Sequence, residues 1–358
     1  MKLDIKFKFD EKIKKGDYSA KYFLVTKNIL ESEKKEETSL LRFKHFSDNV
    51  VVAGIQESLQ LIKFCLPKKI YDKLKIYYLE DGTITNSCQP ILAIEGKYSD
   101  FAFLENIIDG ILSRRSSIAT NVKRIVDLIG SQKIIYMADR SDDYSLQAYD
   151  GYAAYIGGVK TFVTKQHASF LKKDKNVNVV GTIPHALIQQ YNGDLYSALI
   201  AYKKVNKKGK VIALIDFYNN CVDEIRKLKE KGLKQLDYVR IDTSSSLIDE
   251  SLKDLYQKTI DKSLYGVNDK LIRNVRNELD RLGYKNTKII ISSSLNYEKI
   301  KNYLDKKTPI DVFGVGKSFL NININFTADL VKTNDKYFAK TGRDQNIDKY
   351  LKKMKTIN

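Results

Sequence analysis

The chain has 358 residues, of which 43% are hydrophobic, enough to bury the core of one large domain or two ordinary ones. No stretch approaches the roughly eighteen uninterrupted apolar residues of a membrane span, and the opening Met1–Lys6 alternates charged and apolar residues, unlike a signal peptide. The cysteines Cys65, Cys88 and Cys221 are widely spaced and odd in number, which excludes a cysteine zinc knuckle and a disulfide framework. We therefore expect a cytoplasmic protein.

The formal net charge of +18 is compatible with a nucleic acid, an anionic membrane surface or a phosphorylated small substrate as partner. Lysine is spread along the whole chain among many Asn, Ile and Tyr residues and without Trp, as an A/T-rich coding background produces. No basic and aromatic nucleic-acid motif accompanies it. We expect neither nucleic acid nor membrane as a partner.

The first hundred residues show mixed strand and helix patterns. Tyr22–Thr26 has the residue types of a strand. Val50–Ile55 precedes a helical pattern that stops near Pro67, and Ile84–Ile94 predicts further strands. From Phe101 the apolar spacing becomes helical, and it predicts one helix up to about Leu112 and another from Ile118 to Leu128.

After Gly130, seven short runs rich in β-branched residues alternate with helical segments. This alternation predicts a parallel sheet with both faces covered, and seven units favour closure into a barrel. The residue after each run then points toward one common rim. The runs are Lys133–Met137, Thr161–Val163, Val177–Val180, Val211–Ile215, Tyr238–Ile241, Lys288–Ile291 and Ile310–Phe313.

His185 lies just past the end of the third run, within Gly181–Ile188. Pro184 before it has no backbone donor and favours extended geometry at Ile183. The edge between a strand and a helix is where an α/β fold gathers functional side chains. From this position alone, a histidine that caps a helix or fills a loop is an equal alternative.

Two strand ends carry phosphate-binding features. Ser292–Ser294 offers hydroxyls and backbone amides ahead of a helix that we expect to begin at Leu295, whose amino end favours an anion. Gly314 and Gly316 let the backbone approach a phosphate closely, and in barrels a phosphate commonly binds at the last two strand ends. We expect an anionic ligand there.

Four charged residues complete the predicted site. Asp216 and Asp242 end consecutive strands, where carboxylates suit ribose hydroxyls or magnesium bound to pyrophosphate, with helix capping as the structural alternative. Arg114 and Arg140 are suited to clamp pyrophosphate or a carboxylate, with solvation as the alternative.

Several segments, in order along the chain, together resemble the type II phosphoribosyltransferases. Ile111–Thr120 resembles the "LQR-x-SGIAT" segment of the quinolinate enzymes, and Gly181–Leu187 matches the "GT-x-PHAL" segment of the nicotinate enzymes. Further matches are Glu95–Tyr98, Asp150–Tyr152, Leu214–Asp216, Val239–Thr243 and Asp311–Gly316.

This resemblance implies an α/β fold, with an irregular, incomplete TIM-like barrel beside an amino-terminal α/β sandwich domain. We place the sandwich at residues 1–125, with residues 320–358 packing back on it, and the barrel that binds phosphoribosyl pyrophosphate at residues 126–319. The implied reaction joins nicotinate and 5-phosphoribosyl-1-pyrophosphate to give nicotinate mononucleotide and pyrophosphate in NAD biosynthesis. ATP as co-substrate and Mg²⁺ accompany it.

The resemblance also implies a role for each site residue. His185 would accept a phosphate from ATP, which is chemically reasonable because neutral imidazole is a nucleophile near pH 7. Arg114 and Arg140 would bind anionic groups, and Asp216 and Asp242 the ribose and its metal. Tyr22 would stack on the pyridine ring of a neighbouring subunit, which implies at least a homodimer. The 5′-phosphate would lie on Ser293, Ser294, Gly314 and Gly316.

The chain departs from the family pattern at three places. The "FG-x-RR" segment is here Met137–Ser141, which lacks the second arginine, and the serine-glycine-glycine turn is Ser292–Ser294. The acidic residue before the ring-stacking tyrosine is replaced near Ala20. The alternatives to the nicotinate reaction are a related enzyme that uses nicotinamide or quinolinate, or a non-catalytic basic binding protein.

Overall fold

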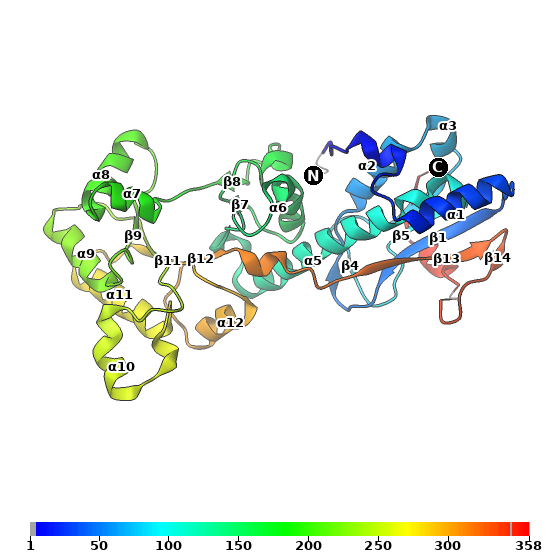
Figure 1. Cartoon of the computed structure of the whole chain (residues 1–358). Coiled ribbons are helices and arrows are strands. Elements are labelled where there is room, and N and C mark those ends of the chain that lie inside the picture. Colours follow the sequence, from blue (N-terminus) through cyan, green and yellow to red (C-terminus); the bar gives the residue numbers. More distant parts are fainter. Residues whose placement is uncertain (1–4, 344–345, 358) are drawn as a thin grey trace.

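The computed structural model describes residues 5–343 and 346–357. Residues 1–4, on which part of the expectation for the amino terminus depends, lie outside the described residues. Two β-sheets lie one after the other along an elongated molecule, and the long helix α5 (Glu105–Ile129) runs between them (Figure 1).

The first sheet is six-stranded and its neighbouring strands pair antiparallel. Its central strand β1 (Thr38–His45) pairs with β5 on one side and with β13 on the other, so strands from both ends of the chain share this sheet. The order is β14 (Lys336–Tyr337), β13 (Phe326–Thr333), β1, β5 (Leu92–Lys97), β3 (Lys75–Tyr78), β15 (Lys355–Ile357). A separate pair joins β2 (Val50–Val51) and β4 (Ile84–Thr85).

Short helices and α2 accompany this sheet. Helix α2 begins after Gly54 and ends at Cys65, just before the Pro67 at which the sequence predicted a stop. Its buried apolar residues join the same core as β1 and β5. The helices are η1 (Glu11–Lys15), α1 (Lys21–Ser32), α2 (Ile55–Cys65), α3 (Lys68–Tyr71), α4 (Tyr98–Phe101), η2 (Ala102–Leu104) and α13 (Asp348–Leu351).

The strand predicted at Tyr22–Thr26 is wrong, because these residues belong to helix α1. The run has five residues, four of them aromatic or β-branched, and is too short for its spacing to distinguish the two-residue period of a strand from the 3.6-residue period of a helix. None of the α1 residues is buried, and the helix contacts α4 and η2. The surroundings of the run therefore decide its conformation, rather than its local propensity.

The second sheet has seven parallel strands, one at each of the seven predicted runs. The last strand pairs with the first, so the strand order is that of a ring opened at one place, between β8 and β9. This confirms the incomplete barrel that we predicted. The order is β8 (Asn178–Val179), β7 (Thr161–Phe162), β6 (Ile134–Tyr136), β12 (Val312–Val315), β11 (Lys288–Ile291), β10 (Tyr238–Ile241), β9 (Ile212–Leu214).

Helices follow the barrel strands and bury one apolar stripe each. In α11 (Asp269–Arg281), Leu271, Ile272, Val275 and Leu279 are fully buried at helical spacing, each worth about 1.5–3 kcal/mol. The other elements are η3 (Ser131–Lys133), η4 (Tyr144–Leu146), α6 (Gln147–Ile156), η5 (Ser169–Leu171), α7 (His185–Gln190), α8 (Leu195–Val205), α9 (Cys221–Glu230), η6 (Glu250–Leu252), α10 (Lys253–Thr259), η7 (Lys262–Leu264), α12 (Tyr297–Asp305) and η8 (Lys317–Leu320).

Helix α5 is one continuous helix where the sequence predicted two. Ile108 and Leu112, in its first half, belong to the core of the antiparallel part, whereas Ile118 and Val122, in its second half, belong to the barrel core. The boundary that we propose between residues 125 and 126 falls inside this helix.

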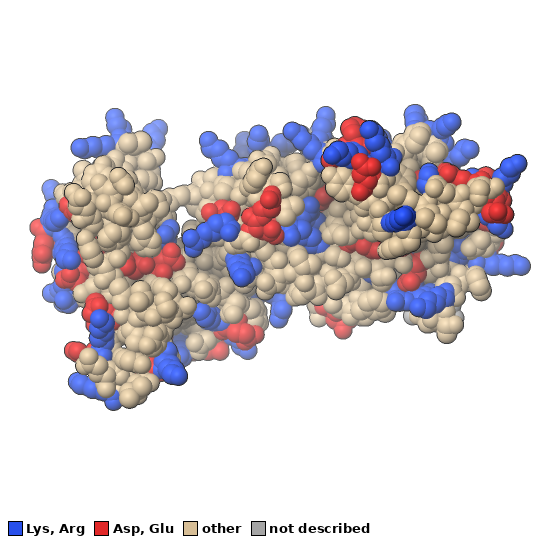
Figure 2. Space-filling view, in the orientation of Figure 1, with Lys and Arg blue, Asp and Glu red and all other residues tan. Residues whose placement is uncertain are grey.

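The surface charge is dispersed. Figure 2 shows Lys and Arg side chains scattered over the visible face and interspersed with Asp and Glu, without a continuous basic stripe on that face. Among residues 5–343 and 346–357, no helix combines the length and the apolar character needed to cross a membrane.

Candidate functional site

The carboxyl ends of β9, β10 and β11 bring three polar side chains together. Asp242 follows β10 directly and Ser292 follows β11 directly, and the Ser292 hydroxyl donates to Asp242 Oδ1 at 2.8 Å. Asp216 follows β9, and burial raises the pKa of its carboxyl, with a further increase from the Asp242 charge. The two predicted carboxylates therefore act on one another at one edge of the sheet.

His185 is the first residue of α7, and Pro184 precedes it in extended conformation. Its Nε2 lies 3.3 Å from Asp216 Oδ1, and its ring centroid lies 6.3 Å from that of Phe217. The His185 side chain is 44% exposed and that of Asp216 only 6%, so the imidazole faces solvent while the carboxylate supports it from below. His185 does not fill a loop. Through Asp216 it contacts a cluster that we call the strand-end group, made of Asp216, Asp242 and Ser292.

Arg240 also belongs to this site and was not among the predicted site residues. It lies within β10, its Nη1 donates to Thr182 Oγ1 at 2.6 Å, and its Nη2 lies 3.7 Å from Asp242 Oδ2. Its Nε is buried without a hydrogen-bond partner. An arginine inside an otherwise apolar strand was the available signal, because such a charge is retained inside a fold only where it has partners.

The turn after β11 has an unusual backbone. Ser293 and Ser294 have φ values of 82° and 52°, in the left-handed region that favours glycine. Within the described residues, their backbone N–H groups make no hydrogen bond. The following helix begins at Tyr297 with Asn296 as its cap, rather than at Leu295 as predicted. The turn therefore offers unused donors of the kind that bind phosphate.

Gly316 is required by its packing against backbone, whereas Gly314 lies against the end of a flexible side chain. A Cβ at Gly314 would lie 2.5 Å from Met137 Sδ, and one at Gly316 would lie 2.5 Å from the Met137 carbonyl oxygen. The Ser318 hydroxyl donates to the Leu295 carbonyl at 2.7 Å and ties the end of β12 to the serine turn. Close packing against backbone therefore accounts for Gly316 whether or not a phosphate binds there, but it does not by itself account for Gly314.

Arg114 is engaged within the protein. Its Nε and Nη2 form a fork on Asp150 at 2.9 and 2.7 Å, and Nη2 also reaches Asp142 at 2.5 Å. These contacts raise the pKa of the Arg114 guanidinium, with the Asp150 hydrogen bond as the largest cause. The neighbouring Arg115 is buried and bridges Asp150 to Glu57 on α2. All polar contacts of Arg114 go to this network rather than to His185.

Two predicted residues lie apart from the strand-end group. Arg140 is exposed in the loop after β6 and makes no polar contact with the described residues. Tyr22 is 65% exposed on α1, against Phe23, and α1 lies at the opposite end of the molecule from α7 (Figure 1). Within one chain, Tyr22 therefore does not reach His185.

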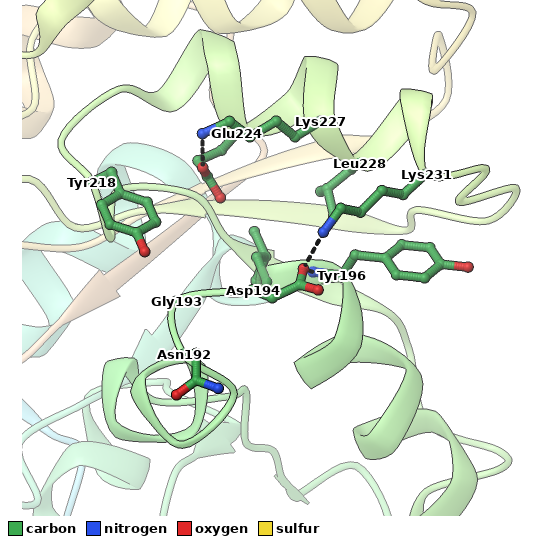
Figure 3. A pocket seen from close by; sticks show the side chains of 10 residues that line it. Asn192, Gly193, Asp194, Tyr196, Tyr218, Glu224, Lys227, Leu228 and Lys231 are labelled. Atoms are coloured by element: carbon green, nitrogen blue, oxygen red, sulfur yellow. Dashed lines mark hydrogen bonds and ion pairs between the residues drawn. The ribbon is translucent and has the colours of Figure 1, made fainter.

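A hollow of about 230 Å³ lies at the far end of α7 (Figure 3). Lys231 pairs with Asp194, and Lys227 pairs with Glu224, so its lysines are already neutralised. Gly193 is required there, since a Cβ would collide with the Tyr218 hydroxyl at 1.7 Å. This hollow adjoins the site but is unsuited to an anion.

No group of three or more His, Cys, Asp or Glu residues suited to hold a metal ion occurs in the part of the chain that the structure describes. Asp216 and Asp242 are only a pair. Mg²⁺, however, is usually held by one or two carboxylates together with substrate phosphates and water. The pair fits that mode of binding and does not form a complete protein cage.

Comparison with known proteins gives concordant matches. A family model described as the amino-terminal domain of quinolinate phosphoribosyl transferase matches residues 22–116. Nicotinate phosphoribosyltransferase of Bacillus subtilis (strain 168) is 26% identical over 249 residues, covering 68% of this chain and 45% of that protein. The chain spans about half the length of the curated relatives it matches.

Solved structures agree with this result. The crystal structure of nicotinate-nucleotide pyrophosphorylase from Pyrococcus furiosus aligns at 30% identity with a TM-score of 0.79, covering 96% of this chain and 81% of that one. Human nicotinic acid phosphoribosyltransferase aligns with a TM-score of 0.63 at 13% identity, covering 89% and 75%. The human structure supports the fold alone.

Proposed function

We propose, from the premise that this chain belongs to the type II phosphoribosyltransferase family, that it joins nicotinate to 5-phosphoribosyl-1-pyrophosphate. The products would be nicotinate mononucleotide and pyrophosphate, as a step of NAD biosynthesis. The observation that carries the proposal is the contact of His185 with Asp216, beside Asp242 and the serine turn.

The strand-end group would bind the phosphoribosyl part. The backbone N–H groups of Ser293 and Ser294 would donate to the 5′-phosphate, and the neighbouring backbone at Gly314 and Gly316 would approach it closely. Asp242 is held by Ser292 and is placed to accept from ribose hydroxyls. Substrate binding at this edge would position the ribose C1 for attack by the pyridine nitrogen while pyrophosphate departs.

His185 would accept the γ-phosphoryl group of ATP, releasing ADP. With Asp216 on Nε2, Nδ1 is the nitrogen available as nucleophile when Nε2 carries the proton. In this role the carboxylate fixes the tautomer and stabilises positive charge on the ring, as a carboxylate does behind a catalytic histidine.

Mg²⁺ would be held by Asp216 and Asp242 together with the substrate's pyrophosphate, and when bound it neutralises negative charge on the leaving group. The protein's own contribution is to hold these two carboxylates at adjacent strand ends. Ser292 keeps Asp242 oriented through its hydroxyl.

The pyridine base would be held by groups from elsewhere. Tyr22 is exposed and distant from His185, which suits stacking on the base in a second copy of the chain. Arg140 is exposed and has no polar partner among the described residues, so it is available for an anionic substrate group. Arg114 would bind the same group once its ion pair with Asp142 is broken. We therefore propose at least a homodimer.

One observation favours nicotinamide as an alternative base. Ser141 stands where the family pattern has a second arginine, which removes a cation from the loop after β6. A neutral carboxamide would lose less from this change than a carboxylate would.

A product assay with phosphoribosyl pyrophosphate and each of nicotinate, nicotinamide and quinolinate, with and without ATP, tests the proposal. We expect nicotinate mononucleotide, with ATP increasing its yield. Absence of that product from nicotinate, with and without ATP, contradicts the proposal. Its formation from quinolinate alone, with release of CO2, would assign the quinolinate reaction instead, and a nicotinamide preference moves the proposal to the alternative base.

A further inference from the structure

We infer that the hydrogen bond between Arg240 and Thr182 is a positioning contact that holds His185 against Asp216. The inference rests on the proposed function only for the task that His185 performs. The contact itself is independent of which pyridine base the protein uses.

The segment Gly181–Pro184 that leads to His185 crosses the open place in the ring between β8 and β9 (Figure 1). The last sheet hydrogen bond before this segment runs from the Val180 N–H to the Phe162 carbonyl. The next backbone hydrogen bond runs from the Leu187 N–H, within α7, to the Pro184 carbonyl. Within the described residues, the N–H groups of residues 181–183 make no hydrogen bond. Among the described residues, the backbone N–H groups of residues 181–183 therefore form no ladder with a neighbouring strand.

Two side chains fasten this segment. Ile183 is buried in the barrel core, which supplies a non-directional anchor. Thr182 supplies the directional one, because its hydroxyl accepts from Arg240 Nη1 at 2.6 Å and donates to the Ile183 carbonyl at 3.3 Å. A hydrogen bond from a charged donor is about twice as strong as one between neutral groups.

Arg240 is suited to this task because it is itself fixed. It lies on β10, which is paired on both sides, with β9 and with β11. Its side chain is mostly buried, and its Nη2 lies 3.7 Å from Asp242 Oδ2. The guanidinium therefore connects the carboxylate at the end of β10 to the segment that carries His185.

The contact between His185 and Asp216, which depends on this arrangement, is long. His185 Nε2 to Asp216 Oδ1 measures 3.3 Å, near the upper end of the hydrogen-bond range, and α7 has only six residues. A small shift of the segment would break it. Loss of the Thr182 hydroxyl should therefore free the imidazole without unfolding the barrel.

Modification by diethyl pyrocarbonate, followed by the absorbance of carbethoxyhistidine, measures this directly. The chain has three histidines, and His45 and His167 are buried, so the fast-reacting ring is His185. We expect T182V to raise its rate constant about fivefold, as loss of one net hydrogen bond would, because Nε2, which contacts Asp216 in the wild type, then reacts in addition to Nδ1. T182S, which keeps the hydroxyl, should react like the wild type.

R240Q provides a second route to the same state. It should accelerate the modification as T182V does, and the T182V/R240Q double variant should react no faster than either single one, because both remove the same contact. T308V is the matched control, since it deletes a threonine hydrogen bond of equal length, to Asp269, without touching this segment. It should keep the wild-type rate.

The inference is overturned if T182V reacts at the wild-type rate, or if T182S reacts as fast as T182V, with both variants folded by circular dichroism. Because the readout requires no substrate, a protein that forms no nicotinate mononucleotide would contradict the proposed function and leave this result unaffected.

Discussion

The strand-end group and a charge network on α5 use similar residues in opposite ways. The network joins Arg114 and Arg115 to Asp142, Asp150 and Glu57. Around His185, the ionic contacts are single and long, 3.3 Å to Asp216 and 3.7 Å between Arg240 and Asp242. In the network, Arg115 is buried and makes bonds of 2.8–3.2 Å to Glu57 and Asp150. The first region keeps hydrogen-bonding capacity for a ligand, and the second uses its capacity to join α2, α5 and α6.

This difference distinguishes residues that serve binding from residues that serve stability, although both sets are arginines and carboxylates. Breaking a buried pair leaves an uncompensated charge, whereas altering an open site mainly changes what it binds. The two regions should therefore respond differently to substitution.

The largest expected effect is a loss of folding stability in the variant R115M. Removing the guanidinium leaves Glu57 and Asp150 buried with less compensation, which should reduce the free energy of unfolding by about 3–5 kcal/mol in urea denaturation. K123M, which breaks the exposed pair of Lys123 with Asp127 on the same helix, should change it by less than about 1 kcal/mol. Equal losses in the two variants would erase the contrast between buried and open pairs.

H185A should show the opposite behaviour. Because the ring is half-exposed and makes one long contact, the free energy of unfolding should change by less than about 1 kcal/mol. Stimulation of nicotinate mononucleotide formation by ATP should disappear, while uncoupled transfer remains measurable. Retained stimulation in the product assay would exclude the phosphohistidine role.

S293G should be stabilising, by about 1 kcal/mol in the same denaturation experiment. Serine at φ 82° pays the cost of the left-handed region, which glycine avoids. S245G, at an exposed turn residue where φ > 0 is not adopted, is the control and should not stabilise. A destabilised S293G would mean that its side chain, rather than its backbone, is needed in the turn.

A pH dependence of stability is expected from Asp81, whose carboxylate lies at the start of α2. Burial raises the pKa of Asp81 to about 6, while its carboxylate accepts from the Ile55 and Gln56 amides and from Tyr152. The folded protein thus binds this proton more tightly than the unfolded chain, with its value near 3.8. Stability therefore falls as pH rises from about 4 to about 6.

D81N replaces the titrating carboxyl group with a neutral amide. Its free energy of unfolding, measured across the same pH range, should therefore lack the decrease that the titration of Asp81 causes in the wild type. Parallel curves for the wild type and D81N would show that Asp81 titrates alike in the folded and unfolded states.

The parallel sheet was predictable because strands covered on both faces appear as continuous β-branched runs. Strand β1 was not, since its buried residues include Arg42, Lys44 and His45, which conceal the pattern of a core strand. His185, Asp216 and Asp242 were found from their places at strand ends. Their mutual contact, and the pairing of Arg114 with Asp150 across 36 positions, depend on the tertiary fold.

The continuity of α5 has a consequence for how the chain can be divided. At about 1.5 Å per residue its 25 residues form a rod of roughly 37 Å that contributes side chains to both cores. A fragment that ended within it would expose apolar residues of one core and lose the partners of Arg114 and Arg115. We therefore expect the two sheets to unfold together, and movement between them would require this helix to bend.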